Sequence, residues 1–104
     1  MANRRAFYDL ANLELNKARR YQTPISFLYL DIDDFKKIND NFGHPIGDQL
    51  LRSVANTIEN NIRAIDLIVR FGGDEFGILL AGAGAESAAQ VAGKLKKKLL
   101  ELVR

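Results

Sequence analysis

The stretch "DLIVRFGGDEFGILLA" (residues 66–81) decides how this chain folds, because two apolar runs flank one short polar turn. Such a pattern predicts a β-hairpin, and we expect Gly72 and Gly73 to supply the positive φ that a tight turn needs. Asp74 is a common turn residue, whereas Glu75 is not. Adjacent carboxylates also repel one another unless a positive charge lies between them. The turn therefore predicts a functional site as well as a hairpin.

The segments around this hairpin alternate between helical and strand periodicity. The predicted elements are a helix over about residues 4–22, a strand over 25–32, a short helix ending at Gly43, a longer helix over 50–62, strands over 66–71 and 76–81, and a last helix over 88–102. In the strand over 25–32, the residues that face either side of the sheet are apolar up to Asp31. This pattern predicts a strand covered on both faces. The order is α-β-α-α-β-β-α.

This order predicts an α+β (α/β) domain with a three-stranded mixed sheet packed against helices. A strand, a helical crossover and a second strand usually run parallel, and a third strand that follows by a hairpin is antiparallel and can lie between them. The first strand then ends beside the hairpin turn. We therefore expect Asp31 and Asp33 to face Asp74 and Glu75 across a short gap.

Converging carboxylates form a hard-oxygen site, for which magnesium with a phosphate co-ligand is the favoured ion. Backbone N–H groups at Gly72 and Gly73 can donate to that phosphate, because glycine lets a ligand approach closely. A divalent cation and a phosphate chain would explain why the acidic residues tolerate one another.

Composition restricts the class of protein. With 104 residues, a net charge of +2 and no cysteine, the chain predicts one domain in a reducing cytoplasm. Its basic residues are too dispersed to predict a nucleic-acid partner. No apolar run approaches the ~18 residues that would predict a membrane span.

Each motif also has a plainer interpretation. A Gly-Gly-Asp turn is often only a turn, and Asp-x-Asp is often a strand end that runs into a helix cap. His44 alone suggests an ordinary loop histidine, and Phe35 suggests a core residue that can also contact a ligand. The lysines at 94–98 suggest a solvated helix face. The placement of the acidic motifs at one sheet edge favours the functional interpretation.

Two motifs, "LDIDDFKKINDNFGHPIGD" (30–48) and "RAIDLIVRFGGDEF" (63–76), resemble the signature of GGDEF domains, the diguanylate cyclases. The stretches "NRRAF" (3–7) and "SAAQVAGKL" (87–95) resemble the helices on either side. This resemblance covers nearly the whole chain. It implies a palm-like, ferredoxin-like core related to nucleotide cyclases, and the condensation of two GTP into cyclic di-GMP (c-di-GMP) with release of two pyrophosphates.

The resemblance also implies roles for individual residues. It implies ligands for one or two Mg²⁺ (or Mn²⁺) ions at Asp31, the Ile32 carbonyl, Asp74 and Glu75. Asp74 would also be the base near the attacking 3′-hydroxyl. The substrate-binding residues that it implies are Gly72, Gly73 and Lys36 at the phosphates, Asn39 and Asp48 at guanine, Phe35 beside the ribose and base, and His44 in the pocket lining. Asp48 can instead be only a helix N-cap.

Family members usually continue past the last helix with a Thr-x-Ser-x-Gly strand, a further helix and a final strand. We therefore interpret residues 1–104 as a single truncated or minimised GGDEF domain. Its alternative function is that of a catalytically inactive fragment that binds c-di-GMP or a partner chain, or only a folding unit. Catalysis would require a homodimer, because each chain presents one GTP. The apolar edge of strand 25–32 predicts pairing with another chain.

Arg63 and Asp66 lie three residues apart just before the second strand, and their spacing from the turn resembles the product-inhibition site of the family. Arginine can contact a phosphate or the guanine Hoogsteen edge in bidentate fashion, and aspartate can accept from guanine N–H groups. An ordinary surface ion pair is the alternative. We expect the pair at the opposite end of its strand from the hairpin.

Overall fold

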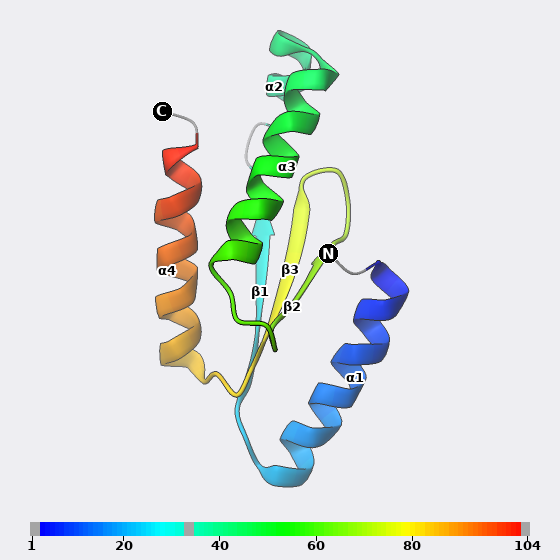
Figure 1. Ribbon diagram of the computed structural model, residues 1–104, viewed down its shortest axis with the longest axis vertical. Coiled ribbons are helices and arrows are strands. Elements are labelled where there is room, and N and C mark those ends of the chain that lie inside the picture. The colour runs from blue at the N-terminus through cyan, green and yellow to red at the C-terminus, as the bar shows by residue number, and fades with distance from the viewer. Residues whose placement is uncertain (1–2, 33–34, 103–104) are drawn as a thin grey trace.

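The fold follows the predicted order α-β-α-α-β-β-α (Figure 1). In the computed structural model, which describes residues 3–32 and 35–102, the elements are α1 (Arg4–Tyr21), β1 (Ile25–Asp31), α2 (Phe35–Phe42), α3 (His44–Asn60), β2 (Leu67–Arg70), β3 (Glu75–Ala81) and α4 (Ala85–Glu101). Asp33, which was predicted to join the acidic site, lies outside the described residues. The fold class predicted from the sequence is therefore confirmed.

The sheet has the strand order β1-β3-β2, so the hairpin strand β3 lies between the other two as predicted. β1 and β2 point in the same direction, but both hydrogen-bonded pairs are antiparallel. The sheet is thus antiparallel throughout rather than mixed, because insertion of β3 removes any parallel neighbours. The register places Asp31 directly opposite Glu75, and Ile25 opposite Ala81 at the other end.

Helices cover the two faces of this sheet unequally (Figure 1). The larger core joins α3 and α4 to one face, and its completely buried side chains include Ile58, Phe76 and Ile78. The smaller core lies under α1, where Phe7 and Ala11 pack on Val69 and Leu79. The alternation of side chains along β3 sends Phe76 and Ile78 to one core and Leu79 to the other.

The expectation that β1 is covered on both faces is wrong. Phe27 is 48% exposed and Tyr29 is 57% exposed, although both are large and apolar or aromatic. The physical reason is that α1 lies mainly over β2, at the opposite edge of the sheet. β1 is an edge strand, as predicted, and its pairing with another chain stays a prediction.

Helix α3 begins earlier than predicted. Gly43 is its N-cap, with φ of 88°, a value that favours glycine, and Pro45 lies in the first turn. His44 is therefore the first helical residue rather than a loop residue. Asp48 lies inside the helix, so its interpretation as an N-cap is wrong.

Gly77 allows two aromatic rings to lie directly on β3. A Cβ at this position would be 2.5 Å from the Phe71 ring and 2.6 Å from the Phe27 ring. We therefore expect Gly77→Ala to lower the free energy of unfolding by roughly 1–3 kcal/mol, the usual cost of overpacking. Urea unfolding followed by circular dichroism measures this change.

Gly93→Ala is the matched control, because a Cβ there would meet nothing within 4 Å. Gly93 lies in α4. Alanine in a helix is favoured over glycine by roughly 0.5–1 kcal/mol, so this variant should be slightly more stable than the wild type. Equal unfolding midpoints for the two variants would show that the rings over Gly77 move aside without cost.

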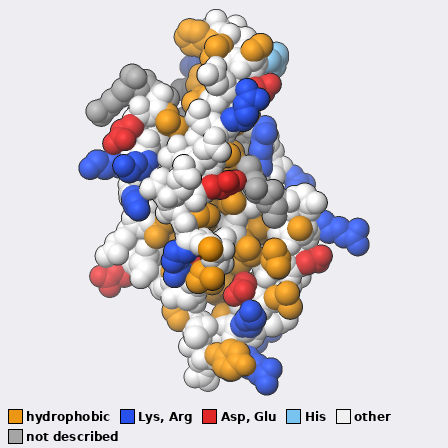
Figure 2. Space-filling model, in the orientation of Figure 1, with side chains coloured by type: hydrophobic (Ala, Val, Ile, Leu, Met, Phe, Trp, Pro, Cys, Tyr) orange, Lys and Arg blue, Asp and Glu red, His pale blue; other side chains and the backbone are white. Residues whose placement is uncertain are grey.

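Hydrophobic side chains gather at the centre of the face in Figure 2, over the strands between α3 and α1, with Lys and Arg side chains spread around the margin. No helix in residues 3–32 or 35–102 has the length and apolar character that a membrane span requires.

Candidate functional site

Carboxylates from β1 and from the hairpin meet at one end of the sheet. Asp31 and Glu75 are direct cross-strand partners, and cross-strand side chains on one face lie close together. The Ile32 N–H donates to the Asp74 carbonyl oxygen over 3.0 Å, which continues the pairing beyond the last sheet residue. The backbone geometry thus brings Asp31 beside Glu75 and Ile32 beside Asp74, and the role of these residues as metal ligands stays a prediction.

Tyr29 joins this acidic end, a contact that the sequence analysis missed. Its hydroxyl donates to Glu75 Oε2 over 2.5 Å. That hydrogen bond, helped by desolvation and by the charges of Glu75, Asp31 and Asp74, raises the pKa of Tyr29 to about 12. Tyr29 and Asp31 are two residues apart on a strand and so lie on the same face, and this spacing is the feature of the sequence that could have revealed the contact.

The Gly-Gly turn does not use positive φ, so that expectation is wrong. Among the described glycines only Gly43 and Gly82 have positive φ. A Cβ on Gly72 would lie 3.3 Å from Glu75 Oε1, a tight contact with the end of a flexible side chain. A Cβ on Gly73 would meet nothing within 4 Å, so its backbone is open to a ligand. The predicted close approach of a phosphate to Gly73 is therefore sterically possible.

Arg70 fixes the turn from inside the hairpin. Its Nε donates to the Gly72 carbonyl over 2.9 Å, and an Nη donates to the Gly73 carbonyl over 3.0 Å. Sequence reasoning missed this role, although an arginine that ends a strand just before two glycines is well placed to reach their carbonyls. Both glycine carbonyls therefore point to the Arg70 guanidinium.

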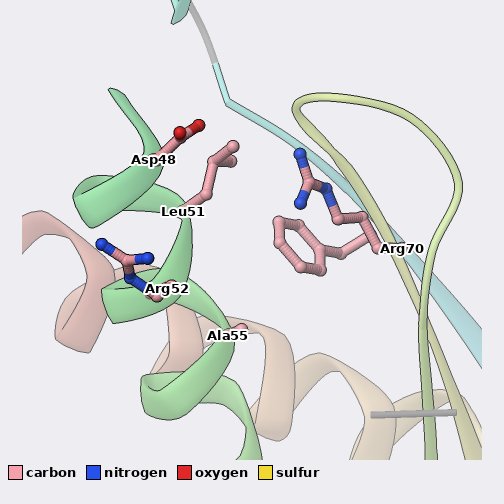
Figure 3. A pocket seen from close by; sticks show the side chains of 6 residues that line it. Asp48, Leu51, Arg52, Ala55 and Arg70 are labelled. Atoms are coloured by element: carbon pink, nitrogen blue, oxygen red, sulfur yellow. The ribbon is translucent and has the colours of Figure 1, made fainter. Parts of the chain in front are cut away.

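A cavity of about 340 Å³ lies between the hairpin and α3 (Figure 3). It is lined by Asp48, Leu51, Arg52, Ala55, Arg70 and Phe76. Figure 3 shows Arg70 reaching from the hairpin toward the α3 residues, with Asp48 and Arg52 one helical turn apart. Two guanidinium groups and one carboxylate suit a ligand that carries both an anionic part and N–H donors.

Asn39, on α2, provides another polar group beside α3. Its Oδ1 is buried without a hydrogen-bond partner, which is costly unless a ligand donor reaches it. A Cβ on Gly47 would lie 1.7 Å from that oxygen and 3.3 Å from the Phe35 ring. Gly47 therefore leaves room for the Asn39 amide and the Phe35 ring, two of the predicted substrate-binding residues. Because Asp48 follows Gly47 in α3, the Asn39 amide lies against the part of the helix that carries Asp48.

The other predicted substrate-binding residues are Phe35, Lys36 and His44. Phe35 is buried in the larger core, as its plainer interpretation held. Lys36 on α2 and His44 at the start of α3 are exposed. No hydrogen bond that connects either side chain to the acidic end is found in the described part of the chain.

The donor set at the sheet edge fits a hard divalent cation. Among residues 3–32 and 35–102, no three His, Cys, Asp or Glu side chains are gathered closely enough to hold a metal ion by themselves. Magnesium, however, is usually held by one or two carboxylates together with waters and substrate phosphates. The Asp31–Glu75 pair, with Asp74 and the Ile32 carbonyl nearby, provides that kind of partial shell.

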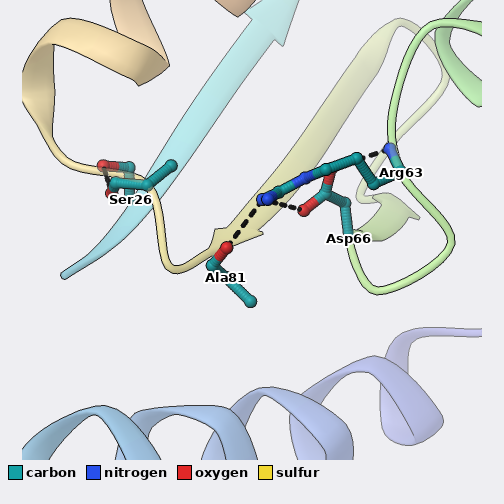
Figure 4. A network of polar contacts seen from close by, with 5 residues as sticks. Ser26, Arg63, Asp66 and Ala81 are labelled. Carbon is teal, nitrogen blue, oxygen red and sulfur yellow. Dashed lines mark hydrogen bonds and ion pairs between the residues drawn. The ribbon is translucent and has the colours of Figure 1, made fainter. Parts of the chain in front are cut away.

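Arg63 and Asp66 form a separate cluster (Figure 4). Arg63 Nη donates to Asp66 Oδ1 over 2.9 Å and to the Ala81 carbonyl over 2.6 Å, and the Arg63 N–H donates to Asp66 Oδ2. Hydrogen bonding to Asp66 raises the pKa of Arg63. Ala81 ends β3, so the pair lies at the opposite end of that strand from Glu75, as predicted.

The order of elements and the strand order β1-β3-β2 are those of a palm-like domain of the nucleotide-cyclase class. The family model described as diguanylate cyclase, GGDEF domain, matches residues 1–103. This chain therefore belongs to the GGDEF domain family.

Relatives agree with this assignment. The chain is 40% identical over 100 residues to the protein named probable diguanylate cyclase DgcT of Escherichia coli K12, and 37% identical over 99 residues to diguanylate cyclase DosC of the same strain. These matches cover 96% and 95% of this chain but 22% of each relative. The chain thus spans about a fifth of the length of the curated relatives that it matches.

Solved structures give the same fold. The GGDEF domain of YfiN (TpbB) from Pseudomonas aeruginosa superposes with a TM-score of 0.89 at 34% identity, covering 94% of this chain and 62% of that chain. The GGDEF domain of DgcB from Caulobacter crescentus, solved in complex with c-di-GMP, gives a TM-score of 0.86 at 35% identity, covering 91% and 56%.

Proposed function

We propose that this chain is a diguanylate cyclase-type domain that binds GTP with Mg²⁺ and condenses two GTP molecules into c-di-GMP and two pyrophosphates. The observation that carries the proposal is the meeting of Asp31 and Glu75 at the sheet edge, beside a turn whose Gly73 backbone is open. Membership of the GGDEF family supports the same reaction.

Guanine recognition is assigned to Asn39 and Asp48. A carboxylate can accept from guanine N1–H and N2–H together, and adenine offers no such pair of donors. The unpartnered Asn39 Oδ1 adds a second acceptor on the same side of α3. Phe35 and His44 are proposed to wall the ribose and base.

The phosphates are assigned to the hairpin end of the site. Backbone N–H groups at Gly72 and Gly73 are proposed to donate to them, and Lys36 is proposed to supply a positive charge. Asp31, Asp74, Glu75 and the Ile32 carbonyl are the proposed ligands of Mg²⁺ or Mn²⁺. When bound, such an ion neutralises phosphate charge and lowers the pKa of a hydroxyl that it contacts.

The reaction needs positioning more than covalent help. The 3′-oxygen of one GTP bonds to the α-phosphorus of the other, the bond to the β-phosphate breaks, and the proton passes to Asp74. Each chain presents one GTP, so two chains must face one another about a two-fold axis for both bonds to form. A monomer should bind GTP without turning it over.

Calorimetric titration tests the binding half of this proposal. The wild-type chain in Mg²⁺ should bind GTP saturably and ATP more weakly, and EDTA should weaken the binding of both nucleotides. Indistinguishable heats for GTP with and without Mg²⁺ would contradict the proposed site.

A c-di-GMP site at Arg63 and Asp66 is our second proposal, favoured by their placement away from the acidic end. The Arg63 side chain is 55% exposed, whereas that of Asp66 is 2% exposed. Arg63 can therefore turn toward a ligand, while Asp66 stays fixed by the Arg63 backbone N–H. Such a site could operate even in a chain that does not turn over.

Titration of c-di-GMP into the wild type and Arg63→Ala tests this site. We expect saturable binding to the wild type and at least a tenfold loss in the variant, because a charged bidentate donor is removed. Arg19→Ala, at an exposed arginine on α1, is the control and should keep c-di-GMP binding. No binding to the wild type would end the idea.

A further inference from the structure

We propose that Tyr29 is a positioning residue that holds the Glu75 carboxylate ready for a divalent cation. The inference rests on the proposed function, since it assigns to Glu75 a role as metal ligand. It concerns only how Tyr29 orients the Glu75 carboxylate.

The first step is the placement of three side chains on one face of the sheet. Tyr29 and Asp31 are two residues apart on β1, so they point to the same face. Glu75 is the cross-strand partner of Asp31, and Gly77 is the partner of Tyr29. The Tyr29 phenol therefore has no side chain directly opposite it and can extend along the face toward Glu75.

The second step is that Tyr29 holds one oxygen of Glu75, while the other oxygen lies beside the glycine turn. Oε2 accepts the hydrogen bond from the Tyr29 hydroxyl. Oε1 lies on the Gly72 side, 3.3 Å from where a Cβ would be. Arg70 in turn holds the Gly72 carbonyl. The carboxylate is thus located between a strand residue and a turn that is itself fixed.

The third step is chemical. An ionised carboxylate offers about four lone-pair positions, so one hydrogen bond leaves the others open to a cation. A neutral phenol orients the group without cancelling its charge. Hydrogen-bond partners of metal ligands typically contribute 10–100-fold to metal affinity through such orientation. Because the Tyr29 ring is largely exposed, its hydroxyl contact rather than core packing is the interaction that a substitution removes.

Tyr29→Phe tests the inference, because it deletes the hydroxyl and keeps the ring. Mn²⁺ binding to the whole chain is measured directly by electron paramagnetic resonance with a non-hydrolysable GTP analogue present, because phosphate oxygens complete the shell that the carboxylates begin. We expect the Mn²⁺ dissociation constant to rise about tenfold, the lower end of the range for such partners. Tyr21→Phe, at an exposed tyrosine on α1, is the matched control and should bind Mn²⁺ like the wild type.

A double-mutant cycle with Glu75→Gln separates positioning from a general structural effect. If Tyr29 acts through Glu75, Tyr29→Phe should change Mn²⁺ affinity no further in the Glu75→Gln background. Equal Mn²⁺ affinity of wild type and Tyr29→Phe, or the same loss in both backgrounds, overturns the inference alone. Absence of Mn²⁺ binding to the wild type overturns the proposed metal site and the inference with it.

Discussion

Asp74→Asn is expected to weaken Mg²⁺-dependent GTP binding by on the order of 100-fold, because even indirect partners of metal ligands contribute 10–100-fold. Asparagine keeps the shape of the side chain and removes its charge. The Asp74 backbone carbonyl still accepts from the Ile32 N–H, so the turn should keep its conformation. The effect should therefore fall on the ligand rather than on the fold.

Two measurements separate an effect on ligand binding from an effect on the fold. Calorimetry with GTP and Mg²⁺ gives the affinity, and urea unfolding without metal gives the stability. Without a cation, the neutral side chain relieves repulsion at the acidic end, so the variant should be at least as stable as the wild type. Asp9→Asn, at an exposed position on α1, is the control. Equal GTP affinity for Asp74→Asn and the wild type would contradict the assignment of Asp74.

Asp48→Ala is expected to erode the preference for GTP over ATP, the second large effect. Removing the acceptor leaves guanine N–H groups unpaired in a partly enclosed cavity, at a cost of about 1–3 kcal/mol in discrimination. Competition binding with labelled GTP against unlabelled ATP measures this preference. Gln49→Ala, the next residue on α3, should leave it unchanged.

Gly47→Ala tests the same preference for GTP over ATP by displacing Asn39. Its Cβ would overlap Asn39 Oδ1, so the amide must move from its present place. Overpacking against Asn39 and the Phe35 ring outweighs the better helix propensity of alanine, so the variant should be less stable than the wild type as well as losing guanine preference. Unchanged GTP-to-ATP discrimination in both Asp48→Ala and Gly47→Ala would rule out base reading at this helix.

The hairpin and its acidic neighbours were predictable because they depend on local pattern and topology. Two apolar runs around a glycine turn fixed β2 and β3, and the crossover before them placed β3 between its neighbours. That arrangement necessarily brought Asp31 beside Glu75. The placement of these two carboxylates was therefore predictable from the order of elements.

What the sequence did not reveal depends on tertiary packing. The exposure of Phe27 and Tyr29 follows from where α1 comes to lie, which periodicity within β1 cannot specify. The contacts of Arg70 and Tyr29 depend on side-chain reach across the sheet end. Gly72 was expected to supply a positive φ, which it does not have, and a side chain there would instead come close to the end of Glu75.

The most direct test of the proposed function is to incubate the whole chain with GTP and Mg²⁺ and analyse the nucleotides by chromatography. Our account predicts c-di-GMP and two pyrophosphates for each c-di-GMP, with a rate per chain that rises with protein concentration because two chains must meet. No c-di-GMP at saturating GTP and high protein concentration would contradict cyclase activity and indicate a GGDEF domain that only binds its ligands.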